Sequence, residues 1–289
     1  GVRPEVRCLP IPPLNLKLKP GQRDGAWKKL TTFEADLHGL TGTALFLDLD
    51  VVVVGPLDDF FTQPGEFLII HDYPRFWRFG ERVVGNSSVY RFALGAHADV
   101  LAYFRTHMDE VQKQYRNEQD FLSHFLHRQG KLNYWPAGWC PSFKYHSIPT
   151  WPTNYWKAPI VPPGARIVIF HGEVNPPDAL AGKRNKRFAF IKPALWVADA
   201  WLATALLVAL VPLHQVVQLQ HQVVVLAAQR LGDVQGVEGP RLPQAIGLGA
   251  RQELPGHGLE VLAHAPHARH ALRVDVGKHA QDAFAIVGT

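Results

Sequence analysis

Cysteine and methionine are scarce in this chain of 289 residues, which has two cysteines, Cys8 and Cys140, and a single methionine, Met108. Two cysteines without a Cys-x-x-Cys or zinc-type spacing exclude a disulfide framework and a cysteine-ligated metal, and they fit a reducing compartment. No charged-then-apolar signal segment follows Gly1. We therefore expect a cytoplasmic protein whose chain starts inside a longer reading frame.

Long apolar runs are also missing. The almost unbroken apolar stretch at 200–213 is too short to span a bilayer, which excludes a transmembrane segment. The basic residues are scattered, and nothing resembles a nucleic-acid-binding module, so we expect no nucleic-acid partner. The formal net charge of +5 leaves two interpretations open. It is either an ordinary solvated basic surface or an attraction for an anionic substrate such as a nucleotide diphosphate.

Serine, asparagine, tyrosine, tryptophan and cysteine are all missing after Leu202, whereas all 8 tryptophans and all 7 tyrosines precede it. A globular domain needs aromatic volume in its core and asparagine or serine in its turns. We therefore divide the chain into a catalytic domain at 1–202 and a tail at 203–289 that is weakly structured or helical and stays outside the sheet. A GC-rich stretch read in the wrong frame produces such a composition, so we expect a non-native tail. The alternative is a genuine extension with an interfacial helix at 200–213, which leaves a peripheral membrane contact open.

Residues 1–202 have the pattern of an α/β domain. Short apolar runs predict strands at 43–47, 67–71, 87–92 and 166–170. Apolar residues at helical spacing predict helices at 27–37, 99–115 and 118–129. Because strands alternate with helices, the sequence predicts a mostly parallel, Rossmann-like sheet covered on both faces.

Two aspartates, Asp48 and Asp50, follow the apolar run at 43–47. Residues two apart on a strand point the same way, so both carboxylates are expected on one face at the carboxyl end, where open α/β sheets bind ligands. Two converging carboxylates raise each other's pKa unless a cation lies between them, and a hard divalent ion with oxygen ligands removes that conflict. A solvated turn after a strand is the competing interpretation.

The surrounding motifs resemble those of the GT-A glycosyltransferases. The run at 43–61, TALFLDLDVVVVGPLDDFF, is similar to their strand, Asp-x-Asp metal motif and following segment, in particular in small bacterial enzymes related to the glycogenin and lipopolysaccharide galactosyltransferase type. Four more segments are similar to further elements of that family in the same order: WKKL at 27–30, NSSVYRF at 86–92, NEQDFL at 117–122 and HGEVNPP at 171–177. The resemblance covers about residues 1–201. The family's first nucleotide-binding strand and helix have no counterpart, so we expect a truncated chain with weak or no activity.

This resemblance implies a metal-dependent transferase. Asp48, Asp50 and His171 would hold Mn²⁺ or Mg²⁺, and Lys28 or Lys29 would add a point charge near the phosphates. Two carboxylates and one imidazole form a mixed oxygen and nitrogen site that suits such an ion. The implied partners are a nucleotide-sugar donor, UDP-linked by resemblance, and an acceptor that is a glycan, lipid or protein. The implied reaction retains the anomeric configuration.

The resemblance also assigns donor-side and catalytic residues. The donor-binding residues are Lys28, Lys29, Asp48, Asn86, Ser87 and Ser88, and the catalytic ones are Glu118, Gln119 and Asp120. Asp72 is added to the donor-binding residues because it ends a predicted strand at the same edge. Neutral donors and acceptors at 86–88 suit sugar hydroxyls, although a turn before a strand has the same composition. Asp120 stands at a helix start, where a capping role is the alternative.

Two other functions remain open. A haloacid dehalogenase-type phosphatase also has a buried strand followed by Asp-x-Asp, with an aspartyl nucleophile. Its later lysine and acidic pair have no convincing counterpart, because Asp58 and Asp59 lie too close to the first motif. The third hypothesis is a catalytically inactive remnant.

Overall fold

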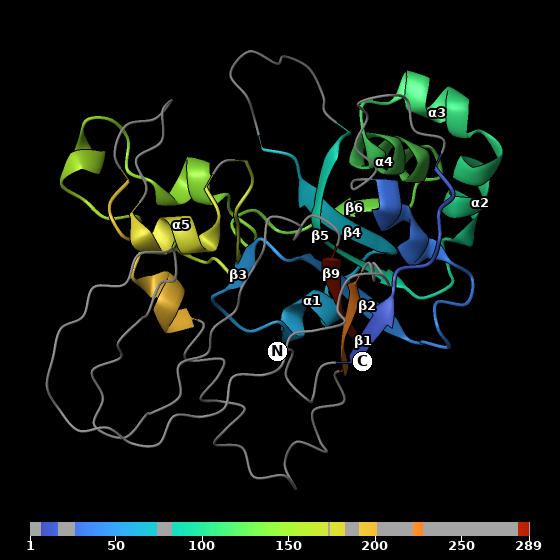
Figure 1. Cartoon of the computed structure of the whole chain (residues 1–289), viewed down its shortest axis with the longest axis horizontal. Helices are drawn as coiled ribbons and strands as arrows, with labels where there is room; N and C mark the ends of the chain where they lie inside the picture. The colour runs from blue at the N-terminus through green and yellow to red at the C-terminus, as the bar shows by residue number, and fades with distance from the viewer. Residues whose placement is uncertain are drawn as a thin grey trace, which may run out of the picture.

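The protein has a mixed α/β architecture in a computed structural model that describes residues 7–16, 27–73, 83–172, 174–182, 191–200, 222–227 and 283–288. Two sheets are present, and helices pack around the larger one (Figure 1). Among these residues, no helix is long and apolar enough to cross a membrane.

The larger sheet has seven strands in the order β1-β8-β9-β2-β5-β4-β6, and a small second sheet pairs β3 with β7. The strands are β1 (Arg7–Pro10), β2 (Thr43–Asp48), β3 (Val51–Val53), β4 (Phe67–His71), β5 (Gly85–Ala93), β6 (Leu132–Tyr134), β7 (Ile167–Ile169), β8 (Gln222–Ala227) and β9 (Ala283–Gly288). All four strands expected from the apolar runs are therefore confirmed, as β2, β4, β5 and β7.

The sheet is mixed, which corrects the prediction of a mostly parallel one. β2 pairs antiparallel with both of its neighbours, β5 and β9, and β4 and β8 also have antiparallel partners in β5 and β9. Only β1–β8 and β4–β6 are parallel. The prediction rested on continuous apolar runs. Such runs indicate burial on both faces, but burial does not specify the direction of the neighbouring strand.

The helices are α1 (Asp58–Thr62), α2 (Ala98–Thr106), α3 (Met108–Gln114), α4 (Glu118–Arg128), α5 (Pro176–Ala181), the 3-10 helices η1 (Trp27–Phe33) and η3 (Thr153–Tyr155), and the π-helix η2 (Phe143–Ser147). The helix predicted at 99–115 is divided into α2 and α3, because His107 leaves the helical conformation with φ −117° and ψ 30°. α4 begins as predicted, where the side chain of Asn117 accepts a hydrogen bond from the backbone N–H of Asp120.

Both faces of the larger sheet are buried at β2, β4 and β5, as predicted. Alternate residues of β2 point to opposite sides, so Phe46 joins one cluster and Leu45 and Leu47 join another. The first cluster packs beneath η1, α2 and α4, where the ring of Phe46 stacks on Tyr90 at 4.3 Å between centroids. The second packs beneath α1. These two layers fix the position and direction of β2, which carries the first aspartate of the motif.

Two strands of the larger sheet come from the tail, β8 and β9. β9 lies between β8 and β2, with Phe46 of β2 opposite Ile286. The expectation that the tail stays outside the sheet is wrong for these two segments. The sequences of these strands, QVVVLA and AFAIVG, are almost entirely apolar and do not alternate with polar residues. Such sequences are typical of strands with apolar surroundings on both faces. The predicted apolar helix at 200–213 and the rest of the tail lie outside the described residues, apart from Ala200, which is helical together with 196–199. The domain division at 202 and the non-native frame stay predictions.

A chain that ends at residue 282 should reveal how much β9 contributes. Its loss leaves one edge of β2 without backbone partners, so we expect Tm to fall by about 5 °C or more. We also expect faster hydrogen exchange at the amides of β2. Removal of Thr289 alone, which lies beyond β9, is the matched control. Unchanged exchange in β2 would contradict the pairing.

Candidate functional site

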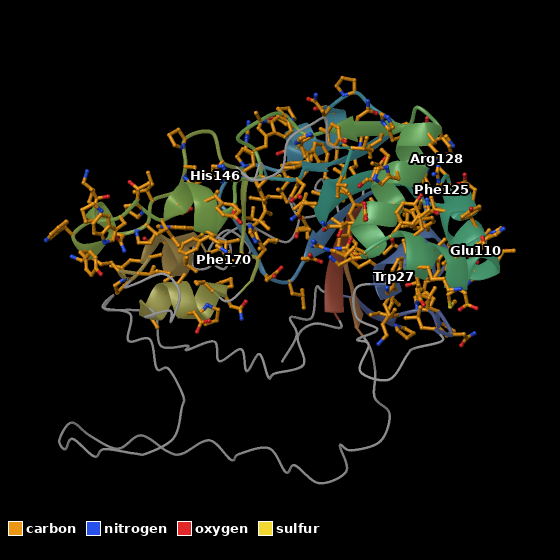
Figure 2. The ribbon with its side chains drawn as sticks, turned by 90° about the horizontal axis from the view of Figure 1, so that it is seen from above. Trp27, Glu110, Phe125, Arg128, His146 and Phe170 are labelled. Atoms are coloured by element: carbon orange, nitrogen blue, oxygen red, sulfur yellow. The ribbon has the colours of Figure 1, made fainter. Side chains whose placement is uncertain are left out.

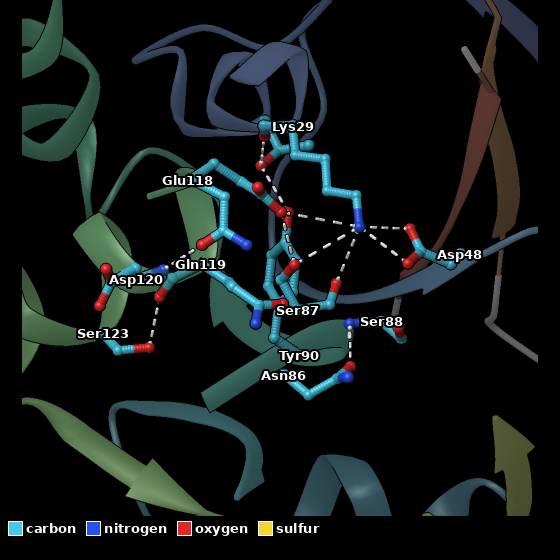
Figure 3. A network of polar contacts seen from close by, with 12 residues as sticks. Lys29, Asp48, Asn86, Ser87, Ser88, Tyr90, Glu118, Gln119, Asp120 and Ser123 are labelled. Atoms are coloured by element: carbon cyan, nitrogen blue, oxygen red, sulfur yellow. Dashed lines mark hydrogen bonds and ion pairs between the residues drawn. The ribbon is translucent and has the colours of Figure 1, made fainter. Parts of the chain in front are cut away.

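Polar side chains from four elements meet beside the carboxyl end of β2 (Figure 3). Lys29 comes from η1, Asp48 ends β2, Ser87 lies on β5, and Glu118 begins α4. The antiparallel pairing of β2 with β5 places Leu47 opposite Val89, which brings Asp48 beside the amino-terminal half of β5. The buried faces of η1 and α4 pack on the same side of the sheet, and this packing carries the other two side chains to that point.

The ammonium group of Lys29 is the centre of this cluster. Its Nζ lies 2.7 Å from each carboxylate oxygen of Asp48, 3.4 Å from Ser87 Oγ and 3.9 Å from Glu118 Oε1. Ser87 Oγ donates a hydrogen bond of 2.7 Å to the same oxygen of Glu118. We call these four residues the Lys29 network. It brings together four of the residues that the sequence assigned to the donor and catalytic sites.

The support beneath the network was not predicted. Thr32 Oγ1 donates to the backbone oxygen of Lys29 at 2.8 Å and lies 3.0 Å from the hydroxyl of Tyr90. The ring of Phe46 lies beneath the ammonium at 5.5 Å. Thr32 and Tyr90 are fully buried. In the sequence they look like ordinary core residues, because no local pattern indicates that their hydroxyls meet.

Charge balance in the network follows from burial. Burial works against the charged form of Lys29, but the carboxylates of Asp48 and Glu118 more than offset it and raise the pKa of the ammonium. Burial also raises the pKa of Glu118, against the opposing effects of Lys29 and of the hydrogen bond from Ser87. The lysine is therefore held as a cation, and its charge is shared by two acidic groups.

Asp50 lies just past the end of β2, in a turn. The alternation argument from the sequence therefore does not apply to it, because the strand ends at Asp48. The backbone oxygen of Asp50 accepts a hydrogen bond from Phe170 N, which ties the turn to the end of β7. Burial raises the pKa of the Asp50 carboxyl to about 6, with a further rise from Asp48 and an opposing effect of Lys29. The sequence predicted that the two carboxylates raise each other's pKa, and Asp48 does raise the pKa of Asp50.

His171 follows β7, as the sequence predicts, and it contacts Ser142 and Tyr73. Its Nε2 lies 2.7 Å from Ser142 Oγ, and its ring stacks on Tyr73 at 5.4 Å between centroids. Among the described residues, no three histidine, cysteine, aspartate or glutamate side chains are grouped to hold one metal ion. Asp48, Asp50 and His171 therefore do not form a three-ligand site in this conformation. The partnership with Ser142 joins distant segments, and no sequence signal pointed to it.

The other predicted donor-side residues are Asn86 and Ser88 on β5, Asp72 just past β4 and Lys28 on η1. Asn86 Oδ1 accepts from the backbone N–H of Ser88 at 2.9 Å, which shapes the start of β5. Asp72 is buried just past β4, and its Oδ1 accepts from the N–H of Tyr73. Lys28 is half-buried on η1 beside Lys29.

The two residues after Glu118 act mainly on α4 itself. Asp120 Oδ2 accepts from the backbone N–H of Arg116, and its Oδ1 lies 3.4 Å from His124 Nε2. This arrangement matches the capping alternative for Asp120. The backbone oxygen of Gln119 accepts from Ser123 Oγ, which in turn accepts from Gly85 N at the start of β5. Ser123 was not predicted, and it ties α4 to the strand that carries Ser87.

The solved structures that are similar to this chain include a glycosyltransferase. No protein-family model and no curated protein matches the chain. The apo-form glycosyltransferase GlyE of Streptococcus pneumoniae TIGR4 is similar over 62% of this chain and 46% of that chain, at 13% identity and a TM-score of 0.38. The match thus spans less than half of that protein's length, and a likeness this weak assigns no activity.

Loss of the Lys29 ammonium should destabilise the fold. In Lys29→Met, Asp48 and Glu118 lose their shared cation, so we expect the free energy of unfolding to fall by about 2 kcal/mol or more at neutral pH. Lys28→Met removes the same charge from the same helix and is the matched control. Denaturant unfolding measures both, and the double variant Lys29→Met/Asp48→Asn should recover part of the loss. Equal stability of the two single variants would argue against the network.

The Asp50 carboxyl should make stability depend on pH. Its pKa of about 6 in the folded protein exceeds its usual value of 3.8, so the folded state binds the proton more tightly. This contribution is present below about pH 4 and is lost as the pH rises through about 6. Asp50→Asn should therefore raise Tm above about pH 6 and change it little near pH 4. The control is Asp58→Asn at an exposed position, and a parallel shift of both variants at every pH would contradict the assignment.

Proposed function

We propose that this chain is a glycosyltransferase that binds a nucleotide-diphosphate sugar beside the carboxyl end of β2. The single observation that carries the proposal is the Lys29 network, in which residues from four separate elements converge at the end of a buried strand. Open α/β sheets bind ligands at such strand ends, and the same residues lie in the motifs that resemble GT-A enzymes.

The proposed donor site uses the charges of this network and its neighbour. Lys29 supplies a point charge to the diphosphate. Asp48 and Asp50 offer hard oxygen ligands to Mn²⁺ or Mg²⁺, which proteins often hold through one or two carboxylates plus substrate phosphates. The raised pKa of Asp50 agrees with this fit, because a nearby cation would relieve the conflict between the carboxylates. When bound, the ion would supply charge neutralisation to the leaving nucleotide.

The chain's own residues would bind and orient the sugar. Ser87 and Asn86 present neutral polar groups for hydroxyls at the start of β5. Glu118 is held in place by the hydrogen bond from Ser87, on the same side as Lys29. We assign Glu118 and Gln119 to the sugar side of the site, and we expect transfer with retention to a hydroxyl of a glycan, lipid or protein acceptor.

A phosphatase of the haloacid dehalogenase type remains the competing hypothesis. It would use Asp48 as its nucleophile, yet both oxygens of this carboxylate contact Lys29. This contact favours the transferase.

Nucleotide binding should depend on a divalent cation. We expect UDP to bind in the presence of Mn²⁺ by calorimetry, and Asp48→Asn and Asp50→Asn to weaken it by at least about tenfold, or about 1.4 kcal/mol. Asp58→Asn, which removes the same charge from an exposed position on α1, should bind as the parent does.

The same preparation separates the competing hypotheses. Release of free sugar from a UDP-sugar that depends on Mn²⁺ supports the transferase. The phosphatase hypothesis would replace the transferase if the protein hydrolysed p-nitrophenyl phosphate, lost this activity in Asp48→Asn and did not bind UDP. UDP binding that ignores both Mn²⁺ and Asp50 would contradict the metal assignment.

A further inference from the structure

A long segment of this chain carries no negative charge. No aspartate or glutamate occurs at 121–172, although the chain holds 25 acidic residues. Two basic residues of the segment have acidic partners outside it, since Lys131 contacts Glu66 and Arg166 contacts Asp59. Lys144 and Lys157 are exposed. The residues of this segment therefore carry a net positive charge.

The same segment exposes large apolar side chains. Trp151 is 77% exposed and Trp156 is 69% exposed, whereas Trp27 and Trp135 are buried at 4% and 6%. Tyr155, at 42%, lies in the same short turn. Tryptophan is highly buried in most folds, so two adjacent exposed indoles need an explanation beyond chance exposure.

The turn that carries these aromatic residues is held by its own hydrogen bonds. Thr153 Oγ1 donates to the oxygen of Thr150 at 2.7 Å, and the backbone N–H groups of Trp156 and Lys157 donate to Thr153 O at 3.0 and 2.9 Å. Tyr155 and Trp156 pack edge to face at 6.1 Å between centroids. The rings are therefore presented outward by an ordered turn.

Aliphatic and basic side chains continue this surface. Ile160 is 58% exposed, and its backbone N–H donates to the oxygen of Ser147 at the end of η2. η2 carries Lys144, whose ammonium lies over the ring of Tyr145 at 5.4 Å. The aromatic surface is defined by six residues: Lys144, Trp151, Tyr155, Trp156, Lys157 and Ile160.

We propose that the aromatic surface docks on a bilayer that contains anionic lipids. Tryptophan and tyrosine favour the headgroup region, where the ring is partly buried and its polar edge stays wet. Lysines beside them gain from the negative potential of anionic lipids. An aliphatic side chain such as Ile160 adds apolar area, and its burial at the boundary of headgroups and acyl chains strengthens membrane binding.

The composition argues against a sugar chain as the occupant. A glycan needs acceptors for its hydroxyl protons, and carboxylates are the strongest of these. The segment has none, and Asn154, the amide within the turn, is buried. A surface of cations, indoles and an aliphatic side chain suits a lipid headgroup layer better.

The aromatic surface belongs to a different part of the fold from the Lys29 network. Figure 2 shows His146, which lies on η2, on the opposite side of the molecule from Trp27, which lies on η1 with Lys29. In Figure 1 the yellow-green residues of η2 and η3 lie to the left of the larger sheet. The aromatic surface shares no residue with the network, and the inference does not depend on the proposed function.

Vesicle flotation with the full chain tests the proposal. We expect binding to mixed phosphatidylcholine–phosphatidylglycerol vesicles and much weaker binding to phosphatidylcholine alone. Trp151→Ala/Trp156→Ala should reduce the partition coefficient by at least about tenfold. Lys144→Gln and Lys157→Gln should each reduce it by about fivefold. Tyr103→Ala, which removes an exposed aromatic from α2, is the control and should bind as the parent does.

Fluorescence distinguishes docking through this turn from other contacts. Brominated lipids should quench the parent protein, and Trp151→Phe/Trp156→Phe, which keeps the aromatic area, should remain bound but lose most of that quenching. Vesicle binding that survives Trp151→Ala/Trp156→Ala would overturn the proposal. So would a change in tryptophan fluorescence with soluble oligosaccharides but not with vesicles, or a dimer that this double variant abolishes.

Discussion

The candidate site depends on the contact of the Lys29 ammonium, which is partly buried, with the carboxylates of Asp48 and Glu118. Each of these charges alone would be costly to bury, and together they bring η1, β2 and α4 to one point. Ser87 completes the arrangement by a hydrogen bond to Glu118. A stabilising ion pair and a candidate ligand site are therefore the same group of atoms. If the diphosphate of a nucleotide contacted Lys29, Asp48 would lose its cationic partner and would need another cation. This is the physical reason why we expect nucleotide binding to depend on a metal ion.

The sheet determines where this network lies. β2 is central in the order of strands, buried on both faces, and paired on both edges. Such a strand has little freedom to shift, so the position of Asp48 is set by the core as a whole. Asp50, two residues further, accepts a hydrogen bond from Phe170 N at its backbone oxygen. Burial and the neighbouring Asp48 raise the pKa of its carboxyl, which suits a group that binds a cation.

Two surfaces of opposite character lie in different parts of the molecule. The Lys29 network is acidic and largely enclosed, whereas the aromatic surface is basic, apolar and open to solvent. The first suits a polyvalent anion bound together with a cation, and the second suits an extended anionic layer. A transferase that rests on a bilayer through the second surface would keep the first accessible to a nucleotide from solution.

The sequence by itself determined the elements that depend on local pattern. It placed β2, β4, β5, β7 and α4, because apolar runs and apolar residues at helical spacing act within a few residues. It also placed Asp48 at a strand end. Only the tertiary structure decided that Lys29 reaches Asp48, that His171 pairs with Ser142, and that β9 lies beside β2. These contacts join residues far apart in the chain, and the packing that joins them leaves no periodic trace in the sequence. Strand direction was decided in the same way, because a strand buried on both faces has the same composition beside a parallel or an antiparallel neighbour.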